Sequence, residues 1–366
     1  MSTGRTKPLL SICVPTYNRA RLLRLLLQSL LPQVEQFGGE VEIVVSDNCS
    51  TDSTPEVINS LAKSKLIRCY RQSENVGCTR NVLALTRHYA VGEFAWILGD
   101  DDMVVSGKLG EVVQAIRENQ DLNYFFVNYF FKSIEDRDRI ISESDSYCVP
   151  EDRECMCADR FQRQVPRWEE LLDIENLSPP AMFTAIVCHI FRRSMWNERI
   201  RLLRLGSDHQ KGLFRSLDET FFHIKILAYM MVGRPAYYVG EPCILMGQGS
   251  QEWSARWPEI FALRLGEVIS LYEQLKVDLR ITRRLRHLYF ESSSPFVARV
   301  GLDSAGPNGG VAFLLMFAWL NRKHPLQVTR IVAPVLREMV VRRLPRCIYY
   351  PLRWLKRLIV PSPRER

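Results

Sequence analysis

A chain of 366 residues, 46% of them apolar, is long enough to bury a core, which excludes a disordered protein or a small disulfide-stapled domain. Charge is unevenly spread: from Lys276 to the end there are 18 Lys or Arg and 5 Asp or Glu, a net charge of +13, so the total of +8 leaves about −5 for residues 1–275. No signal peptide is apparent, and the longest apolar stretch, residues 311–320, is about half the length that spans a bilayer, so we expect a cytoplasmic protein.

The first third of the chain alternates strand-like and helix-like segments. Apolar, β-branched runs predict four strands. The first ends at about Pro15, and the others lie within residues 40–54, 66–72 and 93–98. Apolar residues at helical spacing predict helices within residues 19–33, 54–64 and 75–90. Thr54 is expected to cap the second of these helices, with Pro55 in its first position. Strands that alternate with helices imply parallel strands joined by helical crossovers.

Polar clusters follow each of the four predicted strands. They read PTYNR at 15–19, SDNCSTD at 46–52, ENVG at 74–77 and GDDD at 99–102. Because ligands bind outside the carboxyl ends of the strands in such sheets, we expect these loops to form one binding site.

The remaining chain is less regular. Residues 122–133 predict an aromatic strand, residues 216–233 a helix, and residues 236–257 a strand followed by a glycine-rich loop. From about residue 258 onward the pattern is helical and rich in arginine. We therefore divide the chain into a domain of residues 1–250 and a helical, basic region of residues 251–366, which is a candidate for membrane association.

Three consecutive aspartates, Asp100 to Asp102, stand at the end of the fourth strand. Ionised carboxylates packed this closely repel one another and call for a nearby cation. Carboxylates at a strand end suit Mg²⁺ or Mn²⁺ carrying a diphosphate. The alternative is a solvated acidic turn with no ligand.

The motifs SICVPTYNRARLLRLLLQSLLPQ, EIVVSDNCSTDST, NVGCTRN and GEFAWILGDDD occur in this order over residues 8–110. This ordered set resembles family 2 glycosyltransferases, nucleotide-sugar-dependent enzymes used in assembling bacterial O-antigen, capsule or exopolysaccharide. The resemblance implies the GT-A fold: an α/β architecture with a Rossmann-like, mostly parallel central sheet and flanking helices. It divides the first domain into a nucleotide-binding half at about 8–110 and an acceptor half at about 111–250.

The resemblance also assigns roles to residues. Those expected around the donor nucleotide are Pro15, Thr16, Tyr17, Arg19, Asp47, Asp52, Asn75, Gly77, Arg80 and Asn81. For Asp47 and Asp52 the alternative is an Asx-turn or a helix cap, and for Arg80 a solvated helix position.

The aspartate motif departs from the commonest family form, because Gly99 replaces its first aspartate. Aligning the final pair makes Asp101 a ribose or sugar contact that can also reach the metal, and Asp102 the metal ligand. Asp100 could share either role.

An inverting transfer needs a base for the acceptor hydroxyl. The resemblance places it in an acidic pair ahead of a helix, which makes Asp218 the candidate, with Glu219 beside it. Asp218 could instead be only a helix cap. His223 is the second candidate because of its intrinsic pKa, with a structural role as its alternative.

We therefore predict an inverting, metal-dependent glycosyltransferase that adds a single sugar from a nucleotide-sugar to a saccharide acceptor on a lipid carrier. The Gln-x-x-Arg-Trp motif of processive family members is absent around Gln251, Arg256 and Trp257. The basic tail suits an anionic membrane surface, so we expect a peripheral protein on the cytosolic face of the inner membrane. A solvated helical face remains an alternative for the tail, and we expect no nucleic-acid partner. The rival functions are a sugar nucleotidyltransferase and a binding protein that works through its tail.

Overall fold

The computed structural model describes residues 7–61, 64, 66–133, 155–173, 185–206, 215–248, 256–302 and 310–342. The chain forms two compact units. Unit 1 comprises residues 1–254 and 268–285, and unit 2 comprises residues 255–267 and 286–366. Most of the expected glycine-rich loop (residues 249–255) and the end of the basic tail (residues 343–366) lie outside the described residues.

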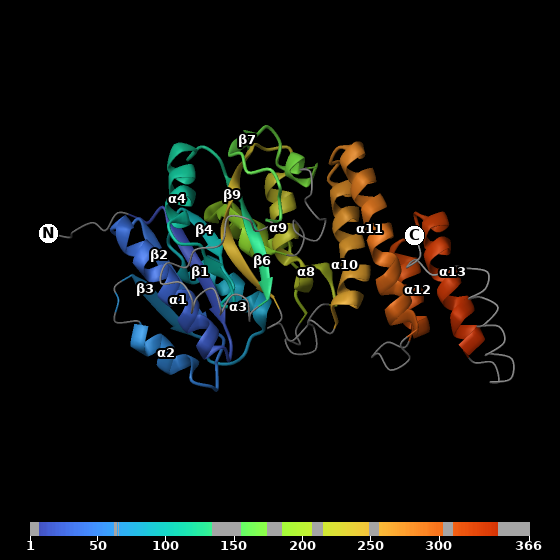
Figure 1. The fold of residues 1–366 in the computed structure, drawn as a ribbon, viewed down its shortest axis with the longest axis horizontal. Coiled ribbons are helices and arrows are strands. Elements are labelled where there is room, and N and C mark those ends of the chain that lie inside the picture. Colours follow the sequence, from blue (N-terminus) through green and yellow to red (C-terminus); the bar gives the residue numbers. More distant parts are fainter. Residues whose placement is uncertain are drawn as a thin grey trace, which may run out of the picture. The chain divides into compact units, whose positions relative to one another are not determined.

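Unit 1 is built on one sheet (Figure 1). Its strands are β1 (Leu10–Thr16), β2 (Val41–Asp47), β3 (Ile67–Arg71), β4 (Phe94–Ile97), β5 (Met103–Val104), β6 (Tyr124–Ser133), β7 (Arg163–Val165), β8 (His189–Arg192) and β9 (Ala236–Gln248). Their order is β3-β2-β1-β4-β8-β6-β9-β5, with β7 paired to β9.

The first four strands are parallel, as their alternation with helices predicts. β1 pairs with β2 from Leu10–Val41 to Thr16–Asp47, and with β4 on its other side. β2 pairs in parallel with β3. Beyond β4 the sheet becomes mixed, because β8 runs antiparallel to both β4 and β6, while β9 is parallel to β6 and antiparallel to β5 and β7. The predicted α/β class, with a mainly parallel sheet and flanking helices, is confirmed.

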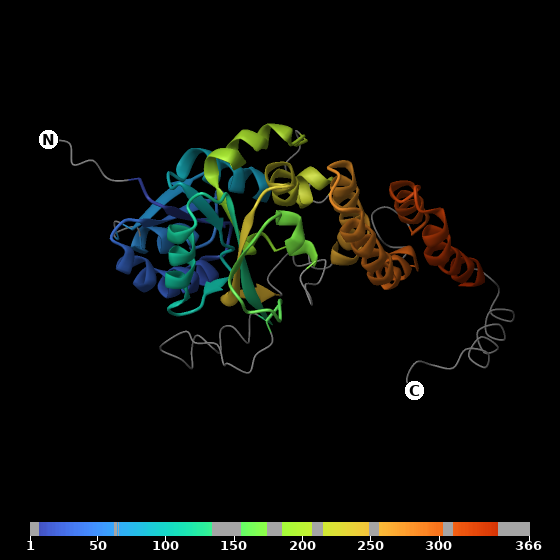
Figure 2. The same ribbon diagram turned by 90° about the horizontal axis from the view of Figure 1, so that it is seen from above.

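Helices cover both faces of this sheet (Figure 2). One group is α1 (Ala20–Val34), α2 (Thr54–Leu61) and α4 (Lys108–Glu118), and the other is α3 (Cys78–Ala84), α7 (Arg193–Arg199) and α9 (Phe222–Met231). In α1 the buried residues Leu23, Leu26, Leu27 and Leu30 recur at helical spacing and form its apolar face. The helix expected at 216–233 is interrupted at Phe221, which separates the short α8 (Leu217–Thr220) from α9.

Short helical turns complete unit 1. They are Glu35–Phe37, the π-helical turn Leu85–Tyr89, Trp168–Asp173, Ile186–Cys188 and Ile200–Leu202.

Unit 2 is helical, as predicted for the C-terminal region. α10 (Trp257–Gln274) and α11 (Leu279–Leu302) contribute residues to both units, while α12 (Gly310–Leu320) and α13 (Pro325–Arg342) belong to unit 2 alone. Within unit 2, Asn321 Nδ2 donates to Tyr289 Oη at 3.2 Å and to the Phe317 carbonyl at 2.9 Å. None of the helices in the described part of the chain combines the length and the apolar character that crossing a membrane requires.

Candidate active site

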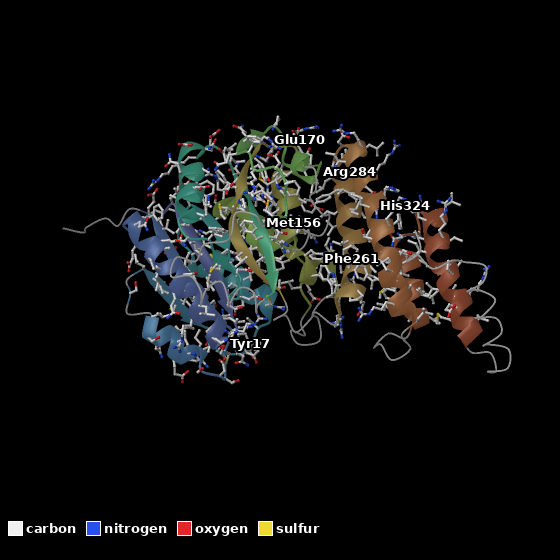
Figure 3. All side chains as sticks on the ribbon, in the orientation of Figure 1. Tyr17, Met156, Glu170, Phe261, Arg284 and His324 are labelled. Carbon is white, nitrogen blue, oxygen red and sulfur yellow. The ribbon has the colours of Figure 1, made fainter. Side chains whose placement is uncertain are left out.

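The carboxyl ends of the parallel strands meet at one edge of unit 1. β1, β2 and β3 end at Thr16, Asp47 and Arg71, which are paired in register across the sheet. The loops that follow are bonded to one another, since Asn18 Oδ1 accepts the Thr51 N–H at 2.7 Å. The side chain of Tyr17, which follows β1, lies at the lower edge of unit 1 in Figure 3. The predicted convergence of polar loops is therefore present.

Arg19 provides a positive charge at the aspartate cluster. Its Nη1 lies 2.9 Å from Asp100 Oδ1 and 3.2 Å from Asp101 Oδ2, while Thr16 Oγ1 donates to Asp100 Oδ2 at 2.8 Å. Both aspartates are buried, at 4% and 7% exposure. An arginine that the resemblance places beside the nucleotide base thus contacts the carboxylates directly.

Burial dominates the protonation of these carboxyl groups. The pKa of Asp100 is raised to about 6, because loss of water and the charge of Asp101 together outweigh the opposing effects of Arg19 and Thr16. Burial, followed by the charge of Asp101, also raises the pKa of Asp102 well above its usual range. A further cation at this cluster would favour the ionised carboxylates, so the cluster suits a positively charged ligand.

Two glycines shape the aspartate loop. Asp102 Oδ2 accepts the Gly99 N–H at 2.8 Å, and its Oδ1 accepts the Gly247 N–H at 3.3 Å. A Cβ at residue 99 would lie 2.6 Å from Asp101 Oδ1 and 2.7 Å from Asp102 Oδ2, and a Cβ at residue 247 only 2.2 Å from the Asp101 carbonyl oxygen. Close approach to the loop therefore accounts for glycine at residue 99, where the commonest family motif has an aspartate.

Asp47 is engaged on both carboxylate oxygens. Its Oδ1 accepts the Ser50 N–H at 2.9 Å, and its Oδ2 lies 3.2 Å from Arg71 Nη1. Arg71 Nη2 also donates to the Ser50 carbonyl at 2.7 Å. The Ser50 bond fits the Asx-turn alternative, and the contact of Asp47 with a base or ribose stays a prediction.

Asp52 connects two helix starts. Its Oδ1 accepts the Thr54 N–H at 2.9 Å and its Oδ2 the Ala20 N–H at 3.3 Å. The side chain of Asp52 therefore caps the start of α2. The prediction that Thr54 caps this helix is wrong, because Thr54 is the first residue of α2. These contacts fit the helix-cap alternative for Asp52 and leave its contact with the donor a prediction.

The third loop is tied to the second by amide groups. Asn75 Oδ1 accepts from Asn48 Nδ2 at 2.8 Å and from the Gly77 N–H at 2.9 Å. Gly77 has φ +81°, a conformation that favours glycine, and it precedes α3. Asn81 is buried and bonds to Ser46 through Oδ1 at 2.6 Å and through Nδ2 at 3.0 Å. Both asparagines therefore hold the loop in place, whatever else they contact.

The start of α3 also joins the second half of unit 1. Thr79 Oγ1 donates to the Glu219 carbonyl at 3.1 Å, and Arg80 donates to the Gly206 carbonyl. Arg80 thus bonds to the second half of unit 1, and its contact with the nucleotide stays a prediction. These contacts bring α8, which carries Asp218, next to the third loop.

Asp218 is buried and held from two sides. Lys225 Nζ donates to its Oδ1 at 2.6 Å, and the Arg204 N–H donates to its Oδ2 at 2.9 Å. Ser216 occupies the N-cap position of α8, so Asp218 lies in the first turn and is not the cap residue. The structure therefore fixes the position of this carboxylate, and its role as a base stays a prediction.

His223 lies among aromatic side chains. Its ring centroid is 5.4 Å from that of Phe222, 5.8 Å from His189 and 6.3 Å from Phe221. It is 3% exposed. This environment favours the structural alternative, and its catalytic role is untested.

Two partners of the predicted residues were missed. Arg71 is the last residue of β3 and pairs with Asp47, and Lys225 pairs with Asp218. Both are seven or more residues from their partners in sequence, so only the strand pairing and the break between α8 and α9 reveal them. The close approach of Gly247 to Asp101 had a weak signal in the glycine-rich stretch GQG.

Within the described ranges, no three or more His, Cys, Asp or Glu side chains are grouped so that they could hold a metal ion by themselves. Asp101 and Asp102 nevertheless offer hard carboxylate oxygens at a buried position. Magnesium sites that bind a nucleotide commonly use one or two carboxylates and complete the shell with phosphate oxygens and water. The chemistry of this pair fits that pattern.

Comparison with known sequences gives a family match. The model described as "Glycosyl transferase family 2" matches residues 11–200. Abequosyltransferase RfbV of Salmonella typhimurium is 40% identical over 114 residues, which are 31% of this chain and 33% of that protein. The GalNAc(5)-diNAcBac-PP-undecaprenol beta-1,3-glucosyltransferase of Campylobacter jejuni is 38% identical over 117 residues, 30% of this chain and 35% of that protein. The match thus spans about a third of the length of these curated relatives.

Solved structures share the fold. S. aureus TarS 1-349 superimposes with a TM-score of 0.58 at 15% identity, over 88% of this chain and 82% of TarS 1-349. Its complex with UDP-GlcNAc also gives a TM-score of 0.58, at 17% identity over 88% of this chain and 83% of that one. At these identities the likeness concerns the fold, which confirms the predicted GT-A architecture.

Gly247→Ala should lower the free energy of unfolding by about 1–3 kcal/mol, because its Cβ would lie 2.2 Å from a backbone oxygen that cannot easily move. Gly110→Ala is the control: it lies within α4, its Cβ would meet nothing within 4 Å, and it should raise stability by about 0.5–1 kcal/mol. Urea unfolding measures both. Equal effects of the two substitutions would contradict the close approach at Asp101.

Arg19→Gln should lower the free energy of unfolding at pH 7 by about 1–3 kcal/mol, because buried carboxylates lose a charged partner. Losing Arg19 raises the pKa of Asp100 above its present value of about 6, so acid protonates this carboxyl and the destabilisation disappears. The difference from the wild type should therefore be largest above pH 7 and shrink as the pH falls through about 6. Urea unfolding at several pH values tests this.

Arg24→Gln, an exposed position on α1, provides the matched control and should change stability by less than about 0.5 kcal/mol. A loss for Arg19→Gln that is the same at pH 5 and pH 8 would contradict the charge pairing.

Proposed function

The chain belongs to glycosyl transferase family 2, and we propose that it is an inverting enzyme that moves one sugar from a nucleotide-sugar to a hydroxyl of a saccharide acceptor. The observation that carries this proposal is the meeting of four strand-end loops at one edge of the sheet, where the fourth loop carries the buried cluster of Asp100, Asp101 and Asp102 and the first loop contacts it. Two relatives are named for sugar transfer, and one of these names includes a saccharide on undecaprenol diphosphate. The proposal therefore includes a role for this chain in the synthesis of a cell-surface polysaccharide.

The donor would bind at the carboxyl edge of β1, β2 and β3. The loops there present Tyr17 and the amide-rich segment around Asn75, while Arg19 supplies positive charge beside the aspartates. A diphosphate near Arg19 would gain from this charge, which is partly exposed. The TarS complex with UDP-GlcNAc supports a nucleotide-sugar as the ligand class.

A divalent ion, Mg²⁺ or Mn²⁺, would be held by Asp101 and Asp102. When bound, such an ion neutralises the charge of the departing diphosphate. Asp102 is oriented by the N–H groups of Gly99 and Gly247, which leave lone pairs on both of its oxygens. Thr16 and Arg19 orient Asp100 in the same way.

Asp218 would take the proton from the acceptor hydroxyl. Lys225 and the Arg204 N–H fix the carboxylate, and the contact of Thr79 with Glu219 brings its helix to the donor loops. A fixed carboxylate next to the donor is the arrangement that an inverting transfer requires.

The acceptor would be a saccharide on a lipid carrier, reached at the cytosolic surface of an anionic membrane. The excess of Lys and Arg after Lys276 supports this partner, because basic segments are attracted to anionic headgroups. We propose that this basic segment binds lipid headgroups and not nucleic acid.

Incubation with a panel of radiolabelled sugar nucleotides, with and without EDTA, tests the function. We expect transfer of the sugar to a saccharide–lipid extract, and loss of this transfer in EDTA that excess Mn²⁺ restores. Release of diphosphate with transfer of the nucleotide would instead indicate a nucleotidyltransferase, and no turnover with any donor would leave a binding protein.

Asp218→Asn should lower kcat by about 10²-fold or more while leaving donor affinity unchanged, because it removes the proton acceptor and not a donor contact. Asp102→Asn is the contrasting variant and should weaken Mn²⁺-dependent donor binding. Titration calorimetry and initial rates separate the two effects. Normal turnover of Asp218→Asn would remove this residue as the base, and unchanged donor affinity of Asp102→Asn would remove that residue as a metal ligand.

A further inference from the structure

α12 is apolar on every face. Each of its eleven residues from Gly310 to Leu320 is apolar or glycine. Phe313, Leu314 and Phe317 are buried inside unit 2. A helix that is apolar all round is normally covered on all sides, so its outward face needs an explanation.

The outward face of α12 forms a stripe that we call the α12 stripe, composed of Val311, Leu315 and Trp319. These side chains are spaced four residues apart, which places them on one side of the helix. Their exposed fractions are 46%, 66% and 63%. Contiguous exposed apolar side chains of this kind mark a surface that meets a partner or a membrane.

The charged residues of the segment that carries the α12 stripe are of one sign. Between residues 310 and 337 there is no Asp or Glu, whereas Arg322, Lys323, Arg330 and Arg337 are exposed. The Arg322 guanidinium lies 4.8 Å from the centroid of the Trp319 ring, next to the stripe. Leu326, at the start of α13, adds a further apolar side chain that is 72% exposed.

We propose that the α12 stripe inserts into the headgroup region of an anionic lipid bilayer, with Arg322 and Lys323 contacting lipid phosphates. Apolar residues with tryptophan on one face and basic residues beside them are the composition of helices that lie in this region. The helix is about 16 Å long against a hydrocarbon core of about 30 Å, so it lies along the surface and does not cross it.

Charge argues against a second copy of this chain as the occupant. A symmetric dimer through the α12 stripe would place the basic turn at Arg322 and Lys323 of each copy at the edge of the interface, where residues 310–337 offer no acidic side chain to pair with it. An anionic bilayer offers the opposite charge. The biological role of this membrane contact rests on the proposed function, because an enzyme can reach an acceptor on a lipid carrier only at a membrane.

Flotation of the full chain with vesicles tests the inference. Wild-type protein should float with phosphatidylcholine vesicles containing about 30% phosphatidylglycerol and much less with pure phosphatidylcholine. The double variant Leu315→Ser/Trp319→Ser should lower the partition coefficient on anionic vesicles by about tenfold or more, since two apolar side chains no longer leave water.

Leu279→Ser is the matched control, because Leu279 is an exposed leucine, 59% accessible, at the start of α11 in unit 1. It should change partition by less than about twofold, and circular dichroism should show that all variants keep their helices. The charge variant Arg322→Gln/Lys323→Gln should lower partition onto anionic vesicles by about fivefold per charge and leave the weak binding to neutral vesicles unchanged.

Three results would overturn the inference. One is a double variant that partitions onto anionic vesicles as strongly as the wild type. This result would count against the α12 stripe whether or not deletion of residues 343–366 weakens binding. Another is binding that is independent of lipid charge. The third is a dimer in light scattering that the double variant dissociates. Binding of the donor in solution, without vesicles, is a separate measurement. A protein that binds no donor would contradict the proposed transferase activity, but it would not contradict membrane binding by the α12 stripe.

Discussion

Three carboxylates buried at the end of β4 repel one another, and the groups that offset this repulsion come from distant parts of the chain. Arg19 and Thr16 reach the cluster from the end of β1. The N–H of Gly247 reaches it from β9, almost 150 residues later. The cluster can therefore form only where β1, β4 and the end of β9 lie together, so the fold and the chemistry of the site depend on the same contacts.

This dependence also explains the glycines. Gly247 lies against the Asp101 carbonyl, and Gly99 lies against the side chains of the aspartates. Neither position has room for a Cβ, because the loop between β4 and β5 turns its aspartate side chains onto Gly99, and β9 brings Gly247 against the Asp101 backbone. Glycine at residue 99 therefore leaves the side chains of Asp101 and Asp102 in the positions that the proposed diphosphate and metal ion would require.

The helical unit has a different physical problem. Its helices bury aromatic and aliphatic side chains on their inner faces, yet α12 has no polar face to present to water. An anionic lipid surface would bury the exposed apolar side chains of this helix and would also attract the basic residues beside it. Under the proposed function, donor recognition then belongs to the sheet of unit 1, and recognition of the membrane that carries the acceptor belongs to unit 2.

The sequence by itself determined the alternation of strands and helices, the polar loops at four strand ends and the family, because these signals are local or follow in fixed order. Tertiary structure decided the partners. That Arg19 contacts Asp100, that Arg71 pairs with Asp47 and that Lys225 holds Asp218 could not be read from spacing. Ion pairs between distant segments depend on strand order and helix breaks, which are set by how the whole core packs.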